Sequence, residues 1–222
     1  MGELRLSYPA CMLVEKSRIT REDVDILVAR ALHGAAGRDE VATLLAIEHG
    51  RAAKCADWDR FLVERLTRHF VDEVEPVRGM NPCKVAMIRR ALARGDVVGS
   101  RNEFEVLVRI VEELGEEAAE LAAFALKQIH LAVVEGEGPL ANRRKGLWAA
   151  LDMAHLTAIN RILKALGQDE PLSLTDAEAL FDPAENLLND PEASAWGEFV
   201  AMLTRRPQRA LASRHEAALR AA

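Results

Sequence analysis

The stretch "SRNEFEVLVRIVEELGEEAAELAAFALKQIHLAVVEG", residues 100–136, contains the clearest evidence for the fold of this chain. Ser100 is followed three residues later by Glu103, which is the capping-box pattern that opens an α-helix. Four apolar residues then recur at intervals of three and four and share one helical face: Phe104, Leu107, Val108 and Val111. Gly115 ends this helix, and the acidic residues after it suit the first turn of a longer one. The stretch therefore predicts two consecutive helices.

Helix start and stop signals of the same kind recur along the whole chain. Further starts are expected at Thr20 with Asp23, at Asn81 with Pro82, near Asp152, and at Thr175 with Glu178. Further ends are expected before Pro76 and at Gly50, Gly95, Gly136 and Gly167. Pro183 is expected to break the last helical stretch, with Asp182 capping the helix that follows. Because alternating strand patterns of useful length are absent, the sequence predicts an all-α multi-helix bundle.

The composition agrees with a helical core and limits the classes of partner. Half of the 222 residues are hydrophobic but only 5% are aromatic, so Ala, Leu, Val and Ile must build the core. The 35 acidic residues exceed the 29 basic ones, which argues against a nucleic-acid-binding protein. The sequence has neither an apolar run long enough for a transmembrane segment nor a convincing signal peptide. Three widely spaced cysteines suit free thiols in a reducing compartment, so a cytoplasmic location is expected.

One aromatic pattern occurs twice, near opposite ends of the chain. The segments "DWDRFLVERL" (57–66) and "AWGEFVAML" (195–203) each contain Trp-x-x-Phe followed by aliphatic residues. Residues three apart share a helical face, so both rings of each pair are expected to enter one core. We therefore interpret four residues as structural anchors rather than as an aromatic box for a ligand: Trp58, Phe61, Trp196 and Phe199.

This repeat predicts two related helical modules with a helical segment between them. The predicted parts are an N-terminal extension (1–19), module 1 (20–78), a middle helical segment (79–140), module 2 (141–204) and a basic C-terminal helix (205–222). The last part contains five arginines and one glutamate. Docking of this helix on the acidic body of its own chain is favoured over contact with a membrane or an acidic partner.

Module 2 carries a resemblance to a known family, in the stretch "LTAINRILKALGQDEPLSLTDAEALFDPAENLLNDPEASAWGEFVAML" (156–203). It is similar to a family of uncharacterised bacterial all-helical proteins that look distantly related to the tellurite-resistance TerB-like domains. The segments "GDVVGSRNEFEVLVRIVEE" (95–113) and "ALKQIHLAVVEGEGP" (125–139) match the same family's style. The resemblance covers most of residues 20–204 and rests on composite patterns rather than on catalytic signatures.

The resemblance implies a role in stress responses and a site for a divalent cation, with Asp169, Glu178 and Asp182 as the matching ligands. The residues themselves also allow a purely structural role. Glu178 stands three residues after Thr175, as a capping partner does, and Asp182 can cap the next helix. The spacing of a calcium-binding loop is absent, so capping and solvation are favoured over binding of calcium or magnesium.

Three functional hypotheses follow. The leading one is a non-catalytic, TerB-like protein that acts through an unknown protein partner or self-association, without a cofactor and without nucleic acid. The second is a weak calcium or magnesium binder that uses the three acids of module 2. The third is an enzyme built around His69 with Asp72 and Glu73, although the motifs for zinc, for nucleophiles and for phosphate loops are absent.

Overall fold

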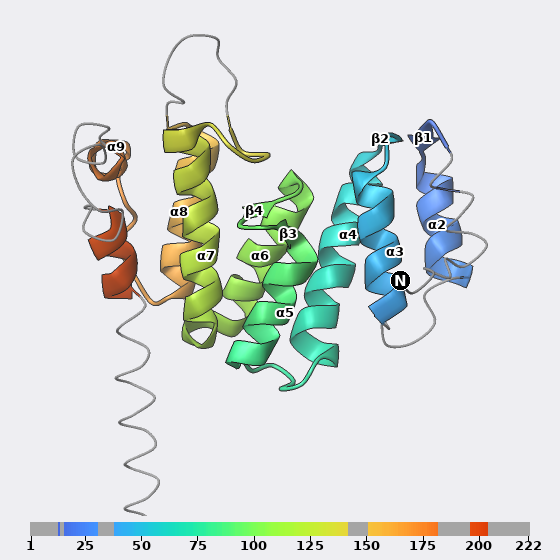
Figure 1. Cartoon of the computed structure of the whole chain (residues 1–222), viewed down its shortest axis with the longest axis horizontal. Helices are drawn as coiled ribbons and strands as arrows, with labels where there is room; N and C mark the ends of the chain where they lie inside the picture. The colour runs from blue at the N-terminus through green and yellow to red at the C-terminus, as the bar shows by residue number, and fades with distance from the viewer. Residues whose placement is uncertain (1–12, 14–15, 31–37, 142–150, 182–195, 204–222) are drawn as a thin grey trace, which may run out of the picture. The chain divides into compact units, whose positions relative to one another are not determined.

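The computed structural model describes residue 13 and residues 16–30, 38–141, 151–181 and 196–203 (Figure 1). Most of these residues are helical and few lie in strands, which confirms the all-α prediction. Contacts divide the chain into two compact units, unit 1 (Met1–Arg109) and unit 2 (Ile110–Ala222). The relation between the two predicted modules and the five-part division stay predictions.

The residues of unit 1 that the structure describes form four named helices and the first part of a fifth. They are α2 (Arg21–Arg30), α3 (Arg38–His49), α4 (Ala56–Arg68), α5 (Pro82–Leu92) and the start of α6 (Arg101–Leu114). One π-helical turn, η1 (His69–Glu73), continues α4. Two pairs of two-residue strands complete the described part: β1 (Arg18–Ile19) is parallel to β2 (Ala53–Lys54), and β3 (Ala93–Arg94) is antiparallel to β4 (Val97–Val98).

The starts of α2, α5 and α6 follow the sequence-based prediction. The Asp23 carboxylate accepts hydrogen bonds from the backbone N–H of Thr20 at 3.0 Å and from its hydroxyl at 3.2 Å. Asn81 Oδ1 accepts the N–H of Lys84 at 2.8 Å. Ser100 Oγ accepts the N–H of Glu103 at 3.1 Å. These side chains satisfy backbone donors that have no partner within the helix itself.

The predicted role of Gly95 is wrong. Helix α5 ends at Leu92, and the next residue, Ala93, is extended (φ −127°, ψ 148°) and pairs with Val98. Gly95 (φ +67°) lies in the tight turn of the β3–β4 hairpin. Two-residue hairpin turns need positive φ, which glycine adopts at little cost, so the glycine marks a hairpin and not a helix end.

Unit 2 contains the end of α6 and three further named helices: α7 (Ala119–His130), α8 (Met153–Ala165) and α9 (Leu174–Leu180). A 3₁₀ turn, η2 (Gly115–Ala118), precedes α7, and a π-helical turn, η3 (Leu131–Glu135), follows it. A last helical segment covers residues 196–203. As predicted, α8 begins after Asp152, whose side chain accepts the N–H groups of Ala154 and His155.

The predicted start of α9 at Thr175 is wrong by two residues. The capping residue is Ser173, whose Oγ accepts the N–H of Asp176 at 3.2 Å. Asn160 on α8 holds the backbone of Leu172 by two hydrogen bonds, of 2.8 Å to its N–H and 3.1 Å to its carbonyl. The turn into the helix therefore comes directly after Leu172. Asp182 and Pro183, where a helix break was expected, lie outside the described residues.

The four aromatic anchor candidates lie in or beside the cores of their units. Trp58 is fully buried, and the ring centroid of Phe61 lies 6.1 Å from that of Trp58. Trp196 is buried and lies 5.8 Å from Phe199, measured between ring centroids. The two phenylalanines are each half-buried. In the described ranges, the helices lack the length and apolar character needed to cross a membrane.

Candidate ligand-binding site in unit 1

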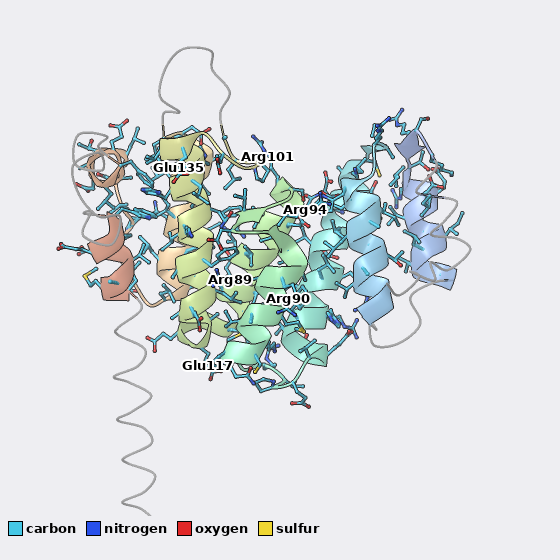
Figure 2. All side chains as sticks on the ribbon, in the orientation of Figure 1. Arg89, Arg90, Arg94, Arg101, Glu117 and Glu135 are labelled. Atoms are coloured by element: carbon cyan, nitrogen blue, oxygen red, sulfur yellow. The ribbon has the colours of Figure 1, made fainter. Side chains whose placement is uncertain are left out.

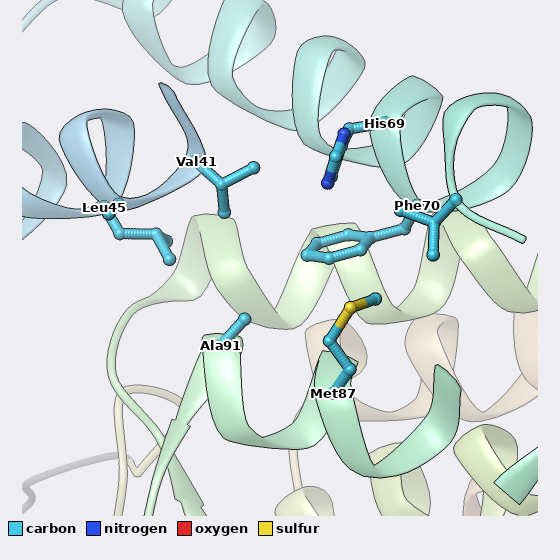
Figure 3. A pocket seen from close by; sticks show the side chains of 8 residues that line it. Val41, Leu45, His69, Phe70, Met87 and Ala91 are labelled. Carbon is cyan, nitrogen blue, oxygen red and sulfur yellow. The ribbon is translucent and has the colours of Figure 1, made fainter. Parts of the chain in front are cut away.

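A cavity of about 330 Å³ lies between α3, η1 and α5 in unit 1 (Figure 3). Eight residues line it: Val41, Ala42, Leu45, His69, Phe70, Val74, Met87 and Ala91. Figure 3 shows the Phe70 ring between the side chains of α3 and those of α5, with the His69 imidazole above it. Apart from His69, the lining side chains are apolar, so the cavity suits a hydrocarbon group.

Local sequence spacing explains why these helices leave a space. Val41 and Leu45 stand four residues apart on α3, and Met87 and Ala91 stand four apart on α5, so each pair projects from one helical face. Ala91 has only a methyl group, which does not fill the distance between the helices. The π-helical turn η1 places two consecutive ring residues at one wall of the cavity.

A buried lysine fixes the end of this wall. Lys84 Nζ donates hydrogen bonds to the carbonyl oxygens of Val74 at 2.9 Å and Pro76 at 2.7 Å. Burial lowers the pKa of Lys84, while the charges of Glu75 and Asp72 partly oppose that shift. The ammonium thus holds the segment after η1 against α5, and with it the lining residue Val74.

A second cavity of about 250 Å³ lies further along α3 and α5. It shares Ala42, Leu45 and Ala91 with the first cavity, so the two are adjacent, and we call them together the α3–α5 groove. The second cavity has four ionisable lining residues: His49, Arg90, Arg94 and Glu103. The groove is therefore apolar at one end and polar at the other.

A buried acid–histidine pair forms one wall of the polar end. His49 Nε2 and Glu103 Oε1 are hydrogen-bonded at 2.9 Å, although the residues are 54 positions apart in the sequence. Glu103 is only 1% exposed, and in the described part of the chain its Oε2 has no hydrogen-bond partner at normal distance. Burial raises the pKa of Glu103, and the nearby Glu48 carboxylate adds to this effect, whereas His49 and the Ser100 backbone oppose it.

Gly99 makes this close arrangement possible. A Cβ atom at that position would lie 2.3 Å from His49 Cε1 and 2.6 Å from Glu103 Oε2. Both distances are far below van der Waals contact, so any larger residue would force the histidine and the carboxylate to move. The glycine before the capping serine of α6 therefore serves the pair rather than the backbone conformation.

The residues next to this pair form a second buried polar network. Glu48 accepts the indole N–H of Trp58 at 2.8 Å and the side-chain amide of Asn102 at 3.1 Å. The same amide donates to Asp59 at 2.8 Å. These bonds join the end of α3 to the starts of α4 and α6. The polar groups of this network make hydrogen bonds to one another. The network therefore supports the wall of the groove and does not offer free groups to a ligand.

The two arginines at the polar end, Arg90 and Arg94, differ from the neighbouring Arg89 in their ion pairing. Arg89 pairs with Asp96 at 3.2 Å. Arg90 and Arg94 are exposed, line the second cavity, and make no ion pair with the residues that the structure describes (Figure 2). Two guanidinium groups thus line the same cavity as a buried carboxylate that is hydrogen-bonded to His49.

The structure brings the predicted His69 cluster together only in part. His69 Nδ1 lies 3.1 Å from Glu73 Oε2, and Arg65 also donates to Glu73, at 2.9 Å. Asp72 instead accepts a hydrogen bond from Arg78 at 3.0 Å. His69 does line the apolar cavity, but as part of a wall and not as the centre of an acidic cluster.

The predicted cation ligands are not seen as a set. Asp169 and Glu178 are both exposed, and Asp182 lies outside the described residues. Among the residues that are described, His, Cys, Asp and Glu side chains form no group of three that could hold a metal ion. The cation site of module 2 stays a prediction.

Sequence reasoning did not find the polar end of the groove. The sequence indicates only a capping role for Glu103, and His49, Arg90 and Arg94 stand in no motif. The one available signal was the glycine immediately before the capping serine, because a glycine there is not needed to start a helix. The pairing of His49 with Glu103 depends on tertiary structure.

Protein-family models, curated proteins and solved structures were compared with the chain, and none matches it. The resemblance to TerB-like domains therefore rests on the sequence patterns alone and stays an expectation.

Proposed function

We propose that the chain is a non-catalytic helical binding protein, and that unit 1 takes an apolar group of its ligand into the cavity between α3, η1 and α5. The observation that carries the proposal is the apolar cavity of about 330 Å³. Sites for small ligands are concave, mostly apolar and typically roughly 300–1,000 Å³ in volume, with a few polar groups that fix orientation. The α3–α5 groove has this composition.

Binding is favoured over catalysis by the chemistry of the cavity lining. His69 is the only one of the eight lining residues with an acid–base group, and Glu73 engages its Nδ1. Glu73 is in turn held by Arg65. A histidine in this arrangement has an adequate structural role, and the other lining residues offer neither a nucleophile nor a second acid or base.

The expectation of a cytoplasmic protein-interaction or stress-response module of TerB-like type is compatible with this site, because an apolar side chain of a partner would fill the same cavity. The alternative of a weak calcium or magnesium binder has less support. Of its three proposed ligands, Asp169 and Glu178 are exposed, which gives neither of them the enclosed set of oxygens that these cations need.

The experiment is a thermal-unfolding titration of the full chain with decanol, a neutral apolar probe. Binding to the folded state alone raises the melting temperature by mass action, so the wild-type protein is expected to show a concentration-dependent rise. Ala91→Leu should abolish that rise by filling the groove from α5, and Ala42→Leu should do so from α3.

The matched control is Ala86→Leu, which makes the same change at an exposed position of α5 outside the lining. This variant should retain the wild-type response. Circular dichroism of each variant identifies any that fails to fold, in which case the variant from the other wall decides. No rise with the wild type, or an equal rise with folded Ala91→Leu and Ala42→Leu, would refute the proposed function.

A further inference from the structure

We propose that the polar end of the α3–α5 groove selects an anionic head group, so that the ligand is a single-chain amphiphile with a carboxylate head and a hydrocarbon tail. This inference rests on the proposed function, because it assumes that the apolar cavity holds the tail.

The geometry of the groove supports a ligand with two chemically different ends. The apolar and polar cavities share lining residues on both helices, Ala42 and Leu45 from α3 and Ala91 from α5. A linear molecule that occupies both cavities would pass these three shared residues, which are small or flexible. Its tail would lie against Phe70 and Met87, and its head would lie near Arg90 and Arg94.

The charges at the polar end determine the sign of the head group. Arg90 and Arg94 contribute two positive charges, and a guanidinium binds a carboxylate by paired, charge-assisted hydrogen bonds. The one acid in the lining, Glu103, is buried and hydrogen-bonded to His49, and burial favours its neutral form. A cationic head group would instead meet both arginines at close range.

The net charge of the chain has the opposite sign to the two arginines, so any affinity for an anion must come from these local groups. The formal net charge of −6 repels anions in general, so a tight interaction with a carboxylate has to come from local positive groups. The size of the groove also favours a small amphiphile over a protein helix. Together the two cavities have the volume of a small-molecule site, with about 330 Å³ in the apolar one and about 250 Å³ in the polar one.

The experiment measures the affinity of the full chain by calorimetry for three probes with the same tail: decanoate, decanol and decylamine. Decanoate is expected to bind about tenfold more tightly than decanol, the size of effect that one net charge-assisted interaction produces. Decylamine should bind most weakly. Raising the salt concentration should reduce the advantage of decanoate, since the arginines are exposed.

The double variant Arg90→Gln/Arg94→Gln should remove the preference for decanoate and leave decanol binding unchanged. Both side chains are exposed and make no ion pair within the described residues, so folding should not be affected. The matched control is Arg51→Gln/Arg60→Gln, which removes the same charge from exposed positions of unit 1 outside both cavities. This control should keep the preference.

The outcomes separate the two proposals. If decanol and decanoate bind equally well, or if the Arg90/Arg94 variant retains the preference, the head-group inference is wrong and the proposed function stands. If none of the three probes binds, both proposals fail. Self-association of the wild-type chain that Ala91→Leu abolishes would also overturn the small-molecule inference, because a second copy would then occupy the groove.

Discussion

Trp58 in unit 1 and Trp196 in unit 2 each stand three residues before a phenylalanine, and each ring is buried. Their surroundings are chemically different. Trp58 donates its indole N–H to the buried Glu48 carboxylate at 2.8 Å. Trp196 lies in an aromatic cluster, with ring centroids 4.5 Å from Phe181 and 5.9 Å from His130. The first tryptophan thus belongs to a polar network that supports a groove, and the second to a largely apolar contact between helices.

The comparison teaches that the Trp-x-x-Phe pattern predicts burial of the tryptophan ring but not the hydrogen-bond partner of its indole N–H. Spacing of three residues places both rings of each pair on one helical face. Whether the indole N–H then meets a carboxylate depends on residues elsewhere in the chain. Glu48 lies ten positions before Trp58, at the end of another helix. Changes at the two tryptophans should therefore have unequal effects.

The largest expected effect is the loss of each tryptophan ring. Trp58→Ala should lower the free energy of unfolding by about 5 kcal/mol and Trp196→Ala by about 3 kcal/mol, the two ends of the usual range for buried tryptophans. Trp58→Ala costs more because it also leaves Glu48 without its indole donor. Chemical denaturation of both variants measures the difference. An equal or larger loss for Trp196→Ala would contradict the contrast between the two sites.

Substitution of each tryptophan by phenylalanine should have a smaller effect, and at Trp58 it separates the contribution of the indole hydrogen bond from that of the ring. Trp58→Phe should lower the free energy of unfolding by about 2 kcal/mol, because a buried carboxylate loses a donor. Trp196→Phe should cost less, about 1 kcal/mol, since it changes mainly packing. A double-mutant cycle with Glu48→Gln should give a coupling of about 1 kcal/mol or more for Trp58. A coupling near zero would show that the Trp58–Glu48 bond does not stabilise unit 1.

Two groups, one in each unit, should make opposite contributions to the pH dependence of stability, and the first is His130 in unit 2. Burial lowers the pKa of His130 below its ordinary value of 6.5, and the charge of Lys127 adds to the shift. The unfolded chain then binds more protons than the folded one, so stability is lost as the pH falls below 6.5. His130→Phe should reduce this loss in a pH series of denaturation curves. An unchanged pH dependence would refute the burial of a neutral imidazole.

Glu103 in unit 1 should show the reverse sign. Its pKa is raised above the ordinary value of 4.5, so the folded state binds the extra proton and stability is lost as the pH rises from 4.5 through the raised pKa. Relative to the wild type, Glu103→Gln should therefore become less destabilising as the pH rises through that interval. Denaturation curves of the two proteins over a pH series measure this trend. A trend in the opposite direction would mean that the influence of His49 on the pKa of Glu103 outweighs that of burial.

The smallest expected effect concerns two threonines. In the described residues, the buried Oγ1 of Thr67 in unit 1 has no hydrogen-bond partner, so Thr67→Val should leave stability unchanged or raise it by up to about 1 kcal/mol. The control is Thr157→Val in unit 2, which removes a hydrogen bond of 2.6 Å to the Met153 carbonyl and should be slightly destabilising. If both substitutions destabilise equally, the Thr67 hydroxyl has a partner.

The helices could be predicted from the sequence because their signals are local. The side chains of Asp23, Asn81 and Ser100 accept backbone N–H groups within one turn, and their effect does not depend on the rest of the fold. The two corrections concern longer-range features. Gly95 belongs to a hairpin that needs a partner strand, and Ser173 caps α9 because Asn160 on another helix holds Leu172.

The candidate site could not be predicted, because tertiary contacts create it. The groove exists where Ala42 and Ala91 on two different helices face a shared space, and alanine at such positions carries no signal in the sequence. The hydrogen bond between His49 and Glu103 spans 54 positions. The acidic residues of module 2 suggested a cation site in the sequence, yet Asp169 and Glu178 are exposed.

The most direct test of the binding cavity is a titration of the chain with decanol, followed by the NMR signals of its six methionine methyl groups. Met87 lines the apolar cavity, whereas Met153 and Met202 are exposed residues of unit 2. We predict a saturable shift of the Met87 methyl that leaves Met153 and Met202 unchanged and that Ala91→Leu abolishes. A titration that shifts the exposed methionines and leaves Met87 unmoved would contradict the central claim.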